Sequence, residues 1–383
     1  MRGVEGGKAM LDPIVNFFTR IFQWIGRGIG LVVGIILWPF LWAGRWYAQR
    51  GWILKTILGV AIVGLLALYA YFFWTTQYWA NFNPAYVANY KFDTRKVSAG
   101  EQVAPGTGTE TAKTCGRSGI ADITADLTDF NVNQNPWVSS MILYKLGLFG
   151  LPWDRTPFFD NKASFQRGIN RAVGRTATDL VDNLARVRGT SGIDPDLDRA
   201  RGSLLYDQYT WYISLSRFGL TLPTPTSYRA AITAIRAFND RLQACNALFD
   251  ARADNLSTLI DRVANDIGNT SATLRDRAEN YNEGWFDTRA DNLFWEAYGQ
   301  LYAYYGIMSA AHADFEDVIK EKHLDNLFDN MEGQFRAALR IQPFIIANGR
   351  EDGWIMPTHL TTMGFYILRV RSNLVEIRNV LQQ

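Results

Sequence analysis

The sequence predicts an all-α protein, with an N-terminal membrane anchor followed by a bundle of long helices. Two observations support this fold class. Two apolar runs lie within the first part of the chain, and over most of the remainder apolar residues recur three, four or seven positions apart. At 383 residues the chain is long enough for one large domain and an accessory region. Two units are therefore expected.

The second apolar run is the clearest membrane signal. Residues 56–74 read TILGVAIVGLLALYAYFFW, carry no charge, and are long enough to cross a hydrocarbon core of about 30 Å as a helix. Tyr69, Tyr71, Trp74 and Tyr78 lie towards its far end, as is typical of a headgroup layer. Bulky aromatics follow the run where a signal peptide would have a small-residue cleavage site, so the anchor is expected to stay attached.

The first apolar run, residues 28–44, is shorter and contains Pro39, so it could cross the bilayer, dip into it or lie along it. Residues 1–27 have apolar positions at helical spacing and predict an amphipathic helix at the membrane surface. Gly26, Gly30 and Gly34 fall four apart. Such a row permits close helix packing in lipid, although glycine is also common in membrane helices generally.

Charge predicts the orientation of the anchor. Every charged residue from Pro13 to Lys55 is basic, and residues 56–90 carry no charge. The positive-inside rule places the amino end in the cytoplasm and the large domain outside. The chain has 39 basic and 37 acidic residues, and its basic excess lies before Thr56. The remainder is slightly acidic, which argues against nucleic acid as a partner.

The predicted domain organisation follows from these segments. A cytoplasmic amphipathic segment precedes the anchor, and a flexible juxtamembrane linker rich in Gly, Thr and Ala precedes the bundle. The boundaries are 1–27 for the amphipathic segment, 28–80 for the anchor, 81–117 for the juxtamembrane segment and linker, and 118–383 for the helical bundle domain.

Capping residues and apolar spacing predict the helices of the bundle. No repeat of fixed period is evident. Three helices are expected first: one after Asn135 and Pro136 that ends at Leu146, one from Asp160 to Gly189, and one after Asp194 and Pro195 that ends at Leu215. A longer helix of about 40 residues is expected after Pro225, with a break near Ala253. The last expected helices span 272–281, 291–308, 314–339 and 358–381.

Known catalytic and cofactor motifs are not found in the sequence. His312, His323 and His359 lack the spacing that places two metal ligands on one helix face. No nucleophile elbow or phosphate-binding loop is present. We predict no catalytic residues, no metal site and no cofactor.

One group of acidic and aromatic residues allows two interpretations. Rings beside acids can form a sugar-binding groove, which outside a bacterial membrane would serve peptidoglycan. Alternatively Asp291 caps a helix, and rings three or four residues apart pack into the bundle. The candidate groove residues are Trp285, Asp287, Arg289, Trp295, Glu296 and Tyr298.

Cys115 and Cys245 are the two cysteines of the chain. In an oxidising compartment they could form a disulfide that closes a loop of about 130 residues. The alternative is that Cys245 is a free core residue.

Four segments resemble a bacterial inner-membrane family known as domain of unknown function 2333. They read WPFLWAGRWYAQRGWILKTILGV, FFDNKASFQRGINRAVGR, GSLLYDQYTWYISLSRFG and WFDTRADNLFWEAYGQLYAYYGI. The resemblance implies a bacterial envelope protein and brings no activity or functional residues. We therefore expect a non-enzymatic inner-membrane protein whose periplasmic helical domain binds an envelope partner or a second copy of the chain. The alternative is a peptidoglycan hydrolase or binding module.

Overall fold

The structure is a computed structural model that describes residues 8–95, 97–103, 114–148, 150–156, 158–186, 192–214, 219–284 and 287–383. It divides into two units, residues 1–70 and residues 71–383. The predicted all-α fold is confirmed, because the described residues form helices with one short strand pair.

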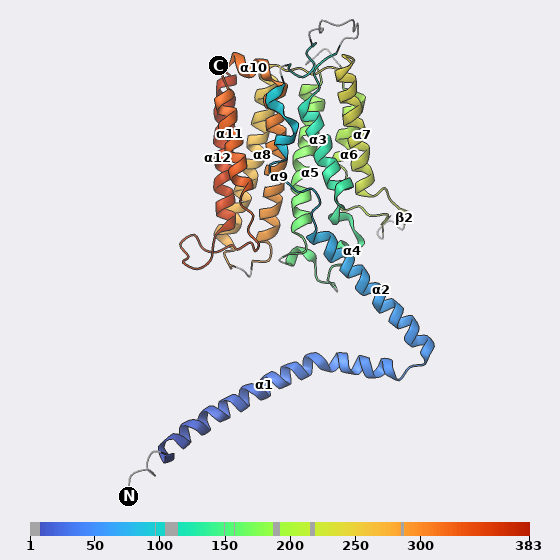
Figure 1. The fold of residues 1–383 in the computed structure, drawn as a ribbon, viewed down its shortest axis with the longest axis vertical. Coiled ribbons are helices and arrows are strands. Elements are labelled where there is room, and N and C mark those ends of the chain that lie inside the picture. The colour runs from blue at the N-terminus through green and yellow to red at the C-terminus, as the bar shows by residue number, and fades with distance from the viewer. Residues whose placement is uncertain are drawn as a thin grey trace. The chain divides into compact units, whose positions relative to one another are not determined.

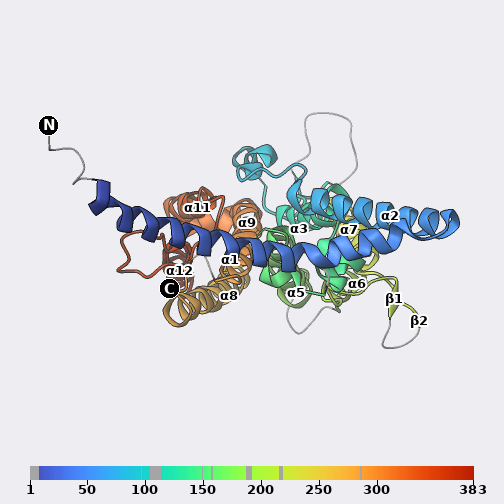
Figure 2. The same cartoon turned by 90° about the horizontal axis from the view of Figure 1, so that it is seen from below.

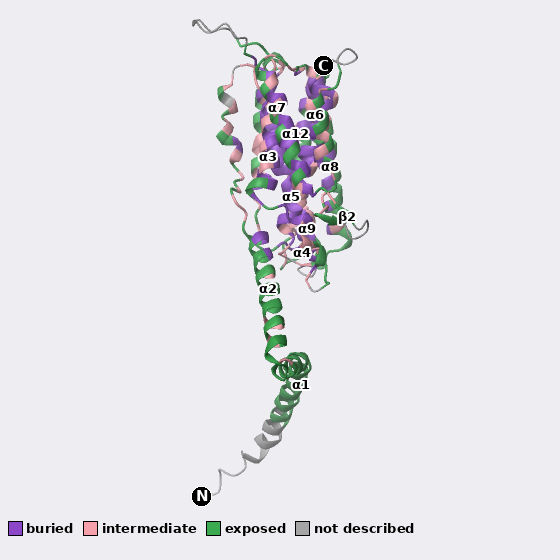
Figure 3. Ribbon diagram, turned by 90° about the vertical axis from the view of Figure 1, so that its right-hand side faces the viewer, coloured by how far each residue is buried: buried purple, intermediate pink, exposed green. Residues whose placement is uncertain are grey.

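The first unit contains α1 (Lys8–Ala48) and most of α2 (Trp52–Gln77). The two segments predicted before residue 45 form one helix, which continues through Pro39. Residues Thr19–Ala48 and Trp52–Gln77 are long and apolar enough to cross a membrane. Figure 3 shows the described part of α1 and most of α2 exposed, in contrast to the buried interior of the second unit.

The second unit is a bundle of long helices (Figure 1). Its α-helices are α3 (Gly119–Asp129), α4 (Ile142–Leu146), α5 (Asn161–Asp179), α6 (Pro195–Leu204), α7 (Thr224–Gln243), α8 (Ala253–Asn280), α9 (Ala290–Asp314), α10 (Glu316–Glu321), α11 (Asp325–Leu339) and α12 (His359–Leu381). Short 3₁₀ or π turns span Tyr86–Tyr90, Phe92–Thr94, Phe130–Gln134, Val138–Ser140, Trp153–Arg155 and Leu180–Leu184, and β1 (Ile213–Ser214) pairs with β2 (Gly219–Leu220).

The long helices of the bundle form two halves. Seen along the helices, α3, α5, α6 and α7 gather on one side and α8, α9, α11 and α12 on the other (Figure 2). In each half the first and third helices run opposite to the second and fourth. Contacts correspond as well: α3 packs on α7 as α8 packs on α12, and α6 packs on α7 as α11 packs on α12. The two halves are therefore structural repeats.

The central helices α5 and α9 occupy equivalent places and make the most extensive contact between the halves. Both carry the pattern Asp-Asn, six intervening residues and then Gly, at Asp160 to Gly168 and at Asp291 to Gly299, with an offset of 131 positions. A Cβ atom at Gly168 would lie 2.1 Å from the backbone oxygen of Glu296, and one at Gly299 would lie 2.1 Å from that of Phe165. Only glycine permits this approach. Periodicity alone missed this repeat, because the two halves share few residue identities.

The segment that follows α2 packs against the bundle. Trp79 stacks on Phe165 with ring centroids 4.9 Å apart, and Tyr86 stacks on Tyr302 at 4.5 Å. The Tyr86 hydroxyl donates to the Tyr302 backbone oxygen at 2.9 Å. Within the juxtamembrane segment and flexible linker predicted over 81–117, residues 81–95 cover α9 and Ser98 is buried. Residues 104–113 of that linker lie outside the described residues.

Several predicted helix bounds are wrong. Asn135 caps no helix; its side chain is buried and exchanges hydrogen bonds with the Ala80 backbone, and a 3₁₀ turn and short α4 follow. The helix capped by Asp194 ends at Leu204, before the β1–β2 hairpin. The long helix predicted after Pro225 is two helices, since α7 ends at Gln243 and α8 absorbs residues 272–280. The helix predicted over 314–339 breaks near His323, whose φ is positive.

Candidate functional site

A cleft in the bundle lies beside α5 and α8. Its volume is about 890 Å³, and the loop after α6 closes one side. α5 contributes three arginines four positions apart, Arg167, Arg171 and Arg175, which helical geometry places on one face. The close contact at Gly168 presses another face of α5 onto α9. The arginine face is therefore left lining the cleft.

Asp266 of α8 anchors two of these arginines. Its Oδ1 atom lies 3.1 Å from Nη2 of Arg171 and 3.0 Å from Nε of Arg175. Oδ2 accepts hydrogen bonds from the Tyr304 hydroxyl at 2.9 Å and from the Gln300 amide. Because the Asp266 side chain is 1% exposed, these partners fix its carboxylate, and the carboxylate in turn orients both guanidinium groups.

Arg167 is held differently from its neighbours. Its guanidinium donates to the hydroxyls of Ser139, Tyr144 and Ser164 at 3.3, 3.0 and 2.9 Å. Within the part of the chain that the structure describes, no carboxylate forms an ion pair with it. The carboxylates of Asp160 and Glu296 act on this charge without forming an ion pair with it. A guanidinium that lines a cleft and has no ion-pair partner is suited to an anionic ligand.

Asp179 and Arg262 pair at the other end of the cleft. Burial raises the pKa of Asp179 to about 7, although Arg262 acts in the opposite direction. The charge of this end of the cleft therefore changes near neutral pH. Among the cleft residues, sequence reasoning had singled out Glu296 as a site candidate and missed the arginines, whose spacing on α5 was the signal that could have found them.

The described members of the predicted acid and aromatic groove do not line a common cleft. Asp287 is buried and pairs with Arg277, while its Oδ2 accepts from the Asn348 amide at 2.8 Å. Tyr298 is buried, and its hydroxyl donates to the Leu339 backbone oxygen at 2.8 Å. Trp295 packs between Trp79 and Tyr298.

Of the remaining candidates, Arg289 is exposed and Glu296 lines the arginine cleft. Trp285 lies outside the described residues. A Cβ atom at Gly26, Gly30 or Gly34 would have no other part of the described chain within 4 Å, so the role of these glycines in helix packing stays a prediction.

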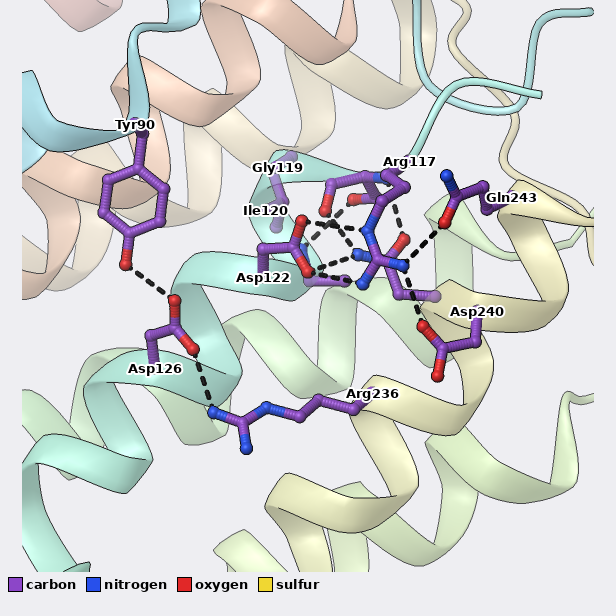
Figure 4. Close-up of polar contacts among 12 residues, drawn as sticks. Tyr90, Arg117, Gly119, Ile120, Asp122, Asp126, Arg236, Asp240 and Gln243 are labelled. Atoms are coloured by element: carbon purple, nitrogen blue, oxygen red, sulfur yellow. Dashed lines mark hydrogen bonds and ion pairs between the residues drawn. The ribbon is translucent and has the colours of Figure 1, made fainter. Parts of the chain in front are cut away.

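Cys115 and Cys245 are joined in a disulfide, with Cα atoms 5.3 Å apart. Cys245 follows α7 with φ of 59°, a left-handed conformation that usually favours glycine. Polar contacts reinforce this junction (Figure 4). Arg117 pairs with Asp122 of α3 at 3.0 Å and with Asp240 of α7 at 2.7 Å. The disulfide thus closes the first half of the bundle, from just before α3 to just after α7.

Comparison with known proteins identifies a family. A bacterial family described as "Uncharacterized protein conserved in bacteria (DUF2333)" matches residues 135–284 and 276–383. No curated protein and no solved structure matches the chain. Since the two matched segments together cover most of the helical bundle and more than half of the sequence, the chain belongs to this uncharacterized bacterial family.

Proposed function

We propose that this chain is a non-enzymatic envelope protein that binds a carboxylate-bearing segment of a protein partner in the arginine cleft. In this proposal α2 anchors the chain in the bacterial inner membrane. The amino end lies in the cytoplasm and the helical domain lies in the periplasm.

The features that support this location are independent of one another. α1 and α2 are apolar enough to span a membrane, and the charges between Pro13 and Lys55 are all basic. Disulfides persist in the periplasm and are rare in the cytoplasm, which fits the pairing of Cys115 with Cys245.

The observation that carries the binding proposal is the state of Arg167. Its guanidinium lines the cleft without an acidic partner among the described residues, whereas Arg171 and Arg175 share Asp266. A carboxylate can accept two parallel hydrogen bonds from a guanidinium, so an acidic side chain or chain terminus matches this donor.

The structure of the other half favours a polypeptide as the ligand. The equivalent face of α9 is covered by an aromatic segment of this same chain, residues 79–92. A groove of this shape can thus hold an extended segment. In contrast, no observation favours the hydrolase alternative, because Asp287 is buried in an ion pair and Tyr298 lies in the core.

Photo-crosslinking in intact cells tests the binding proposal. A photoreactive residue at Asn269, which is exposed in the cleft, should give an adduct of defined mass that Arg167→Gln abolishes. The same probe at Thr233, exposed on α7 outside the cleft, is the matched control. An adduct that persists in Arg167→Gln, or equal adducts at both positions, would contradict the proposal.

Thiol labelling tests the location separately. In cells whose outer membrane is permeabilised and whose inner membrane is intact, Cys115 and Cys245 should react with a membrane-impermeant thiol reagent only after reduction. A second sample is quenched with acid to preserve the redox state of the thiols, and is then labelled without reduction. Labelling of that sample would mean that the thiols are free, and would place the domain in a reducing compartment.

A further inference from the structure

Buried carboxylates without hydrogen-bond partners lie where α5 and α9 begin. Asp160 precedes the first residue of α5 and is 0% exposed, and Asp291 lies in the first turn of α9 and is 4% exposed. Neither oxygen of either carboxylate has a hydrogen-bond partner. Each such group costs free energy unless something outside the described protein atoms satisfies it.

Further unpartnered oxygens belong to residues beside these two in the sequence and to the loop before α5. Oδ1 of Asp154, Asn161 and Asn292 are also buried without a partner. The Asn292 amide donates to the Asp154 backbone oxygen at 2.9 Å, which holds the loop before α5 against the start of α9. Within the described residues, the starts of α5 and α9 and the loop before α5 thus hold seven buried side-chain oxygens without donors.

Each half of the bundle contributes an equivalent pair of residues to this region. Asp160 and Asn161 correspond to Asp291 and Asn292 at the offset of 131 positions, eight and seven residues before the paired glycines. Both helices begin here, and the backbone N–H groups of their first turns stabilise negative charge on the two carboxylates. A carboxylate and an amide oxygen thus come from each half.

From this geometry we infer a calcium site between the two halves of the bundle, with the side-chain oxygens of Asp160, Asp291, Asn161 and Asn292 as ligands. Carboxylate and amide oxygens are the ligands that hard divalent cations take. No three His, Cys, Asp or Glu side chains among the described residues gather into a metal group, so amide oxygens are needed to complete the coordination.

Calcium fits better than magnesium or protons alone. Magnesium retains several water molecules, whereas this region is closed to solvent around Asp160. If both carboxyl groups were protonated, they would supply two hydrogen-bond donors, and the unpartnered indole N–H of Trp295 would supply a third. Three donors are too few for seven oxygens. A calcium ion accepts six to eight oxygens at once.

The site would brace the last turn of α2, which belongs to the second unit. Lys162, one residue beyond Asn161, donates to the backbone oxygens of Thr75 and Tyr78 at 3.0 and 2.7 Å. Phe72 packs on Trp153, one residue before Asp154, with ring centroids 4.9 Å apart. Fixing the loop before α5 would therefore also fix the last turn of α2.

Terbium luminescence and calcium titration of the purified full chain in detergent test the site. Trp295 lies one helical turn from Asp291, so excitation of tryptophan should sensitise bound Tb³⁺, and Ca²⁺ should displace it. Calorimetry should show about one Ca²⁺ per chain, and millimolar Ca²⁺ should raise the Tm of chelator-treated protein by several degrees, whereas Mg²⁺ should raise it less.

The double variant Asp160→Asn, Asp291→Asn should lose both the luminescence and the Tm response. Asp126→Asn, which changes a carboxylate outside this region, should keep both and is the matched control. Absence of stoichiometric Ca²⁺ binding to the unmodified chain would overturn the inference whether or not the variant folds. An equal response in the double variant would also overturn it.

Discussion

Two equivalent grooves of the bundle differ in what covers them. On α9, Tyr298 and Tyr302 lie beneath residues 79–86, and the Tyr302 hydroxyl donates to the Asn83 backbone oxygen at 3.0 Å. On α5, the positions 131 residues earlier are Arg167 and Arg171, which line an open cleft. The same helical face is thus apolar and covered in one half, and charged and open in the other.

This difference separates stability from binding. Covering aromatic rings removes apolar surface from water and contributes to folding. An open face of arginines gains little from folding, since its charges remain partly hydrated. Substitutions in the covered groove should therefore change the free energy of unfolding, and substitutions in the open groove should change ligand binding.

Tyr302→Ala should have the largest effect on stability. The ring is 2% exposed and stacks on Tyr86, so its loss should lower the free energy of unfolding by about 3–5 kcal/mol. Arg171→Ala, at the equivalent position, should lower the free energy of unfolding by about 1–2 kcal/mol, because Asp266 retains its ion pair with Arg175. Urea unfolding of the full chain in detergent measures both. Equal losses would remove the distinction between the grooves.

Reduction of the disulfide should distinguish the two halves in another way. The Cys115–Cys245 bond encloses α3 to α7, and no cysteine lies in the second half. Its loss should cost about 2–4 kcal/mol. Hydrogen exchange should then accelerate first in α3 and α7, while α8 and α12 keep their protection. Uniform acceleration would mean that the two halves unfold as one cooperative unit.

The pH dependence of stability should reveal Asp179. Its folded pKa of about 7 exceeds its ordinary value of 3.8, so the folded state binds the proton more tightly. This contribution is complete below pH of about 4 and is lost as the pH rises through 7, by at most about 1.4 kcal/mol per pH unit. Arg262 and Tyr304 face Asp179 from α8 and α9. Asp179→Asn should flatten the profile in this window, and an unchanged slope would assign it to other groups.

The sequence predicted the helical class because apolar spacing is a local property. It also located α9 and α12 to within a few residues at their starts. The prediction failed where distant contacts decide the structure. The Asn135 side chain bonds to the Ala80 backbone, and the helix break after Gln243 lies beside the disulfide of Cys245 with Cys115. Likewise the arginine spacing on α5 does not reveal that α8 and the loop after α6 enclose these side chains.

Arg167→Gln should change stability least and binding most. Its present partners are hydroxyls of Ser139, Tyr144 and Ser164, which can rebond to an amide or to water, so the free energy of unfolding should change by less than about 1 kcal/mol. A carboxylate ligand would instead lose its charged partner, which should weaken its binding at least tenfold. Fluorescence anisotropy with acidic peptides, ranked against neutral peptides of the same length, measures the loss. If Arg167→Gln weakens acidic and neutral peptides equally, the residue shapes the cleft without selecting charge. If Arg167→Gln weakens only the acidic peptides, the guanidinium of Arg167 selects a charged partner. The open groove then differs from the covered groove because it binds a separate molecule.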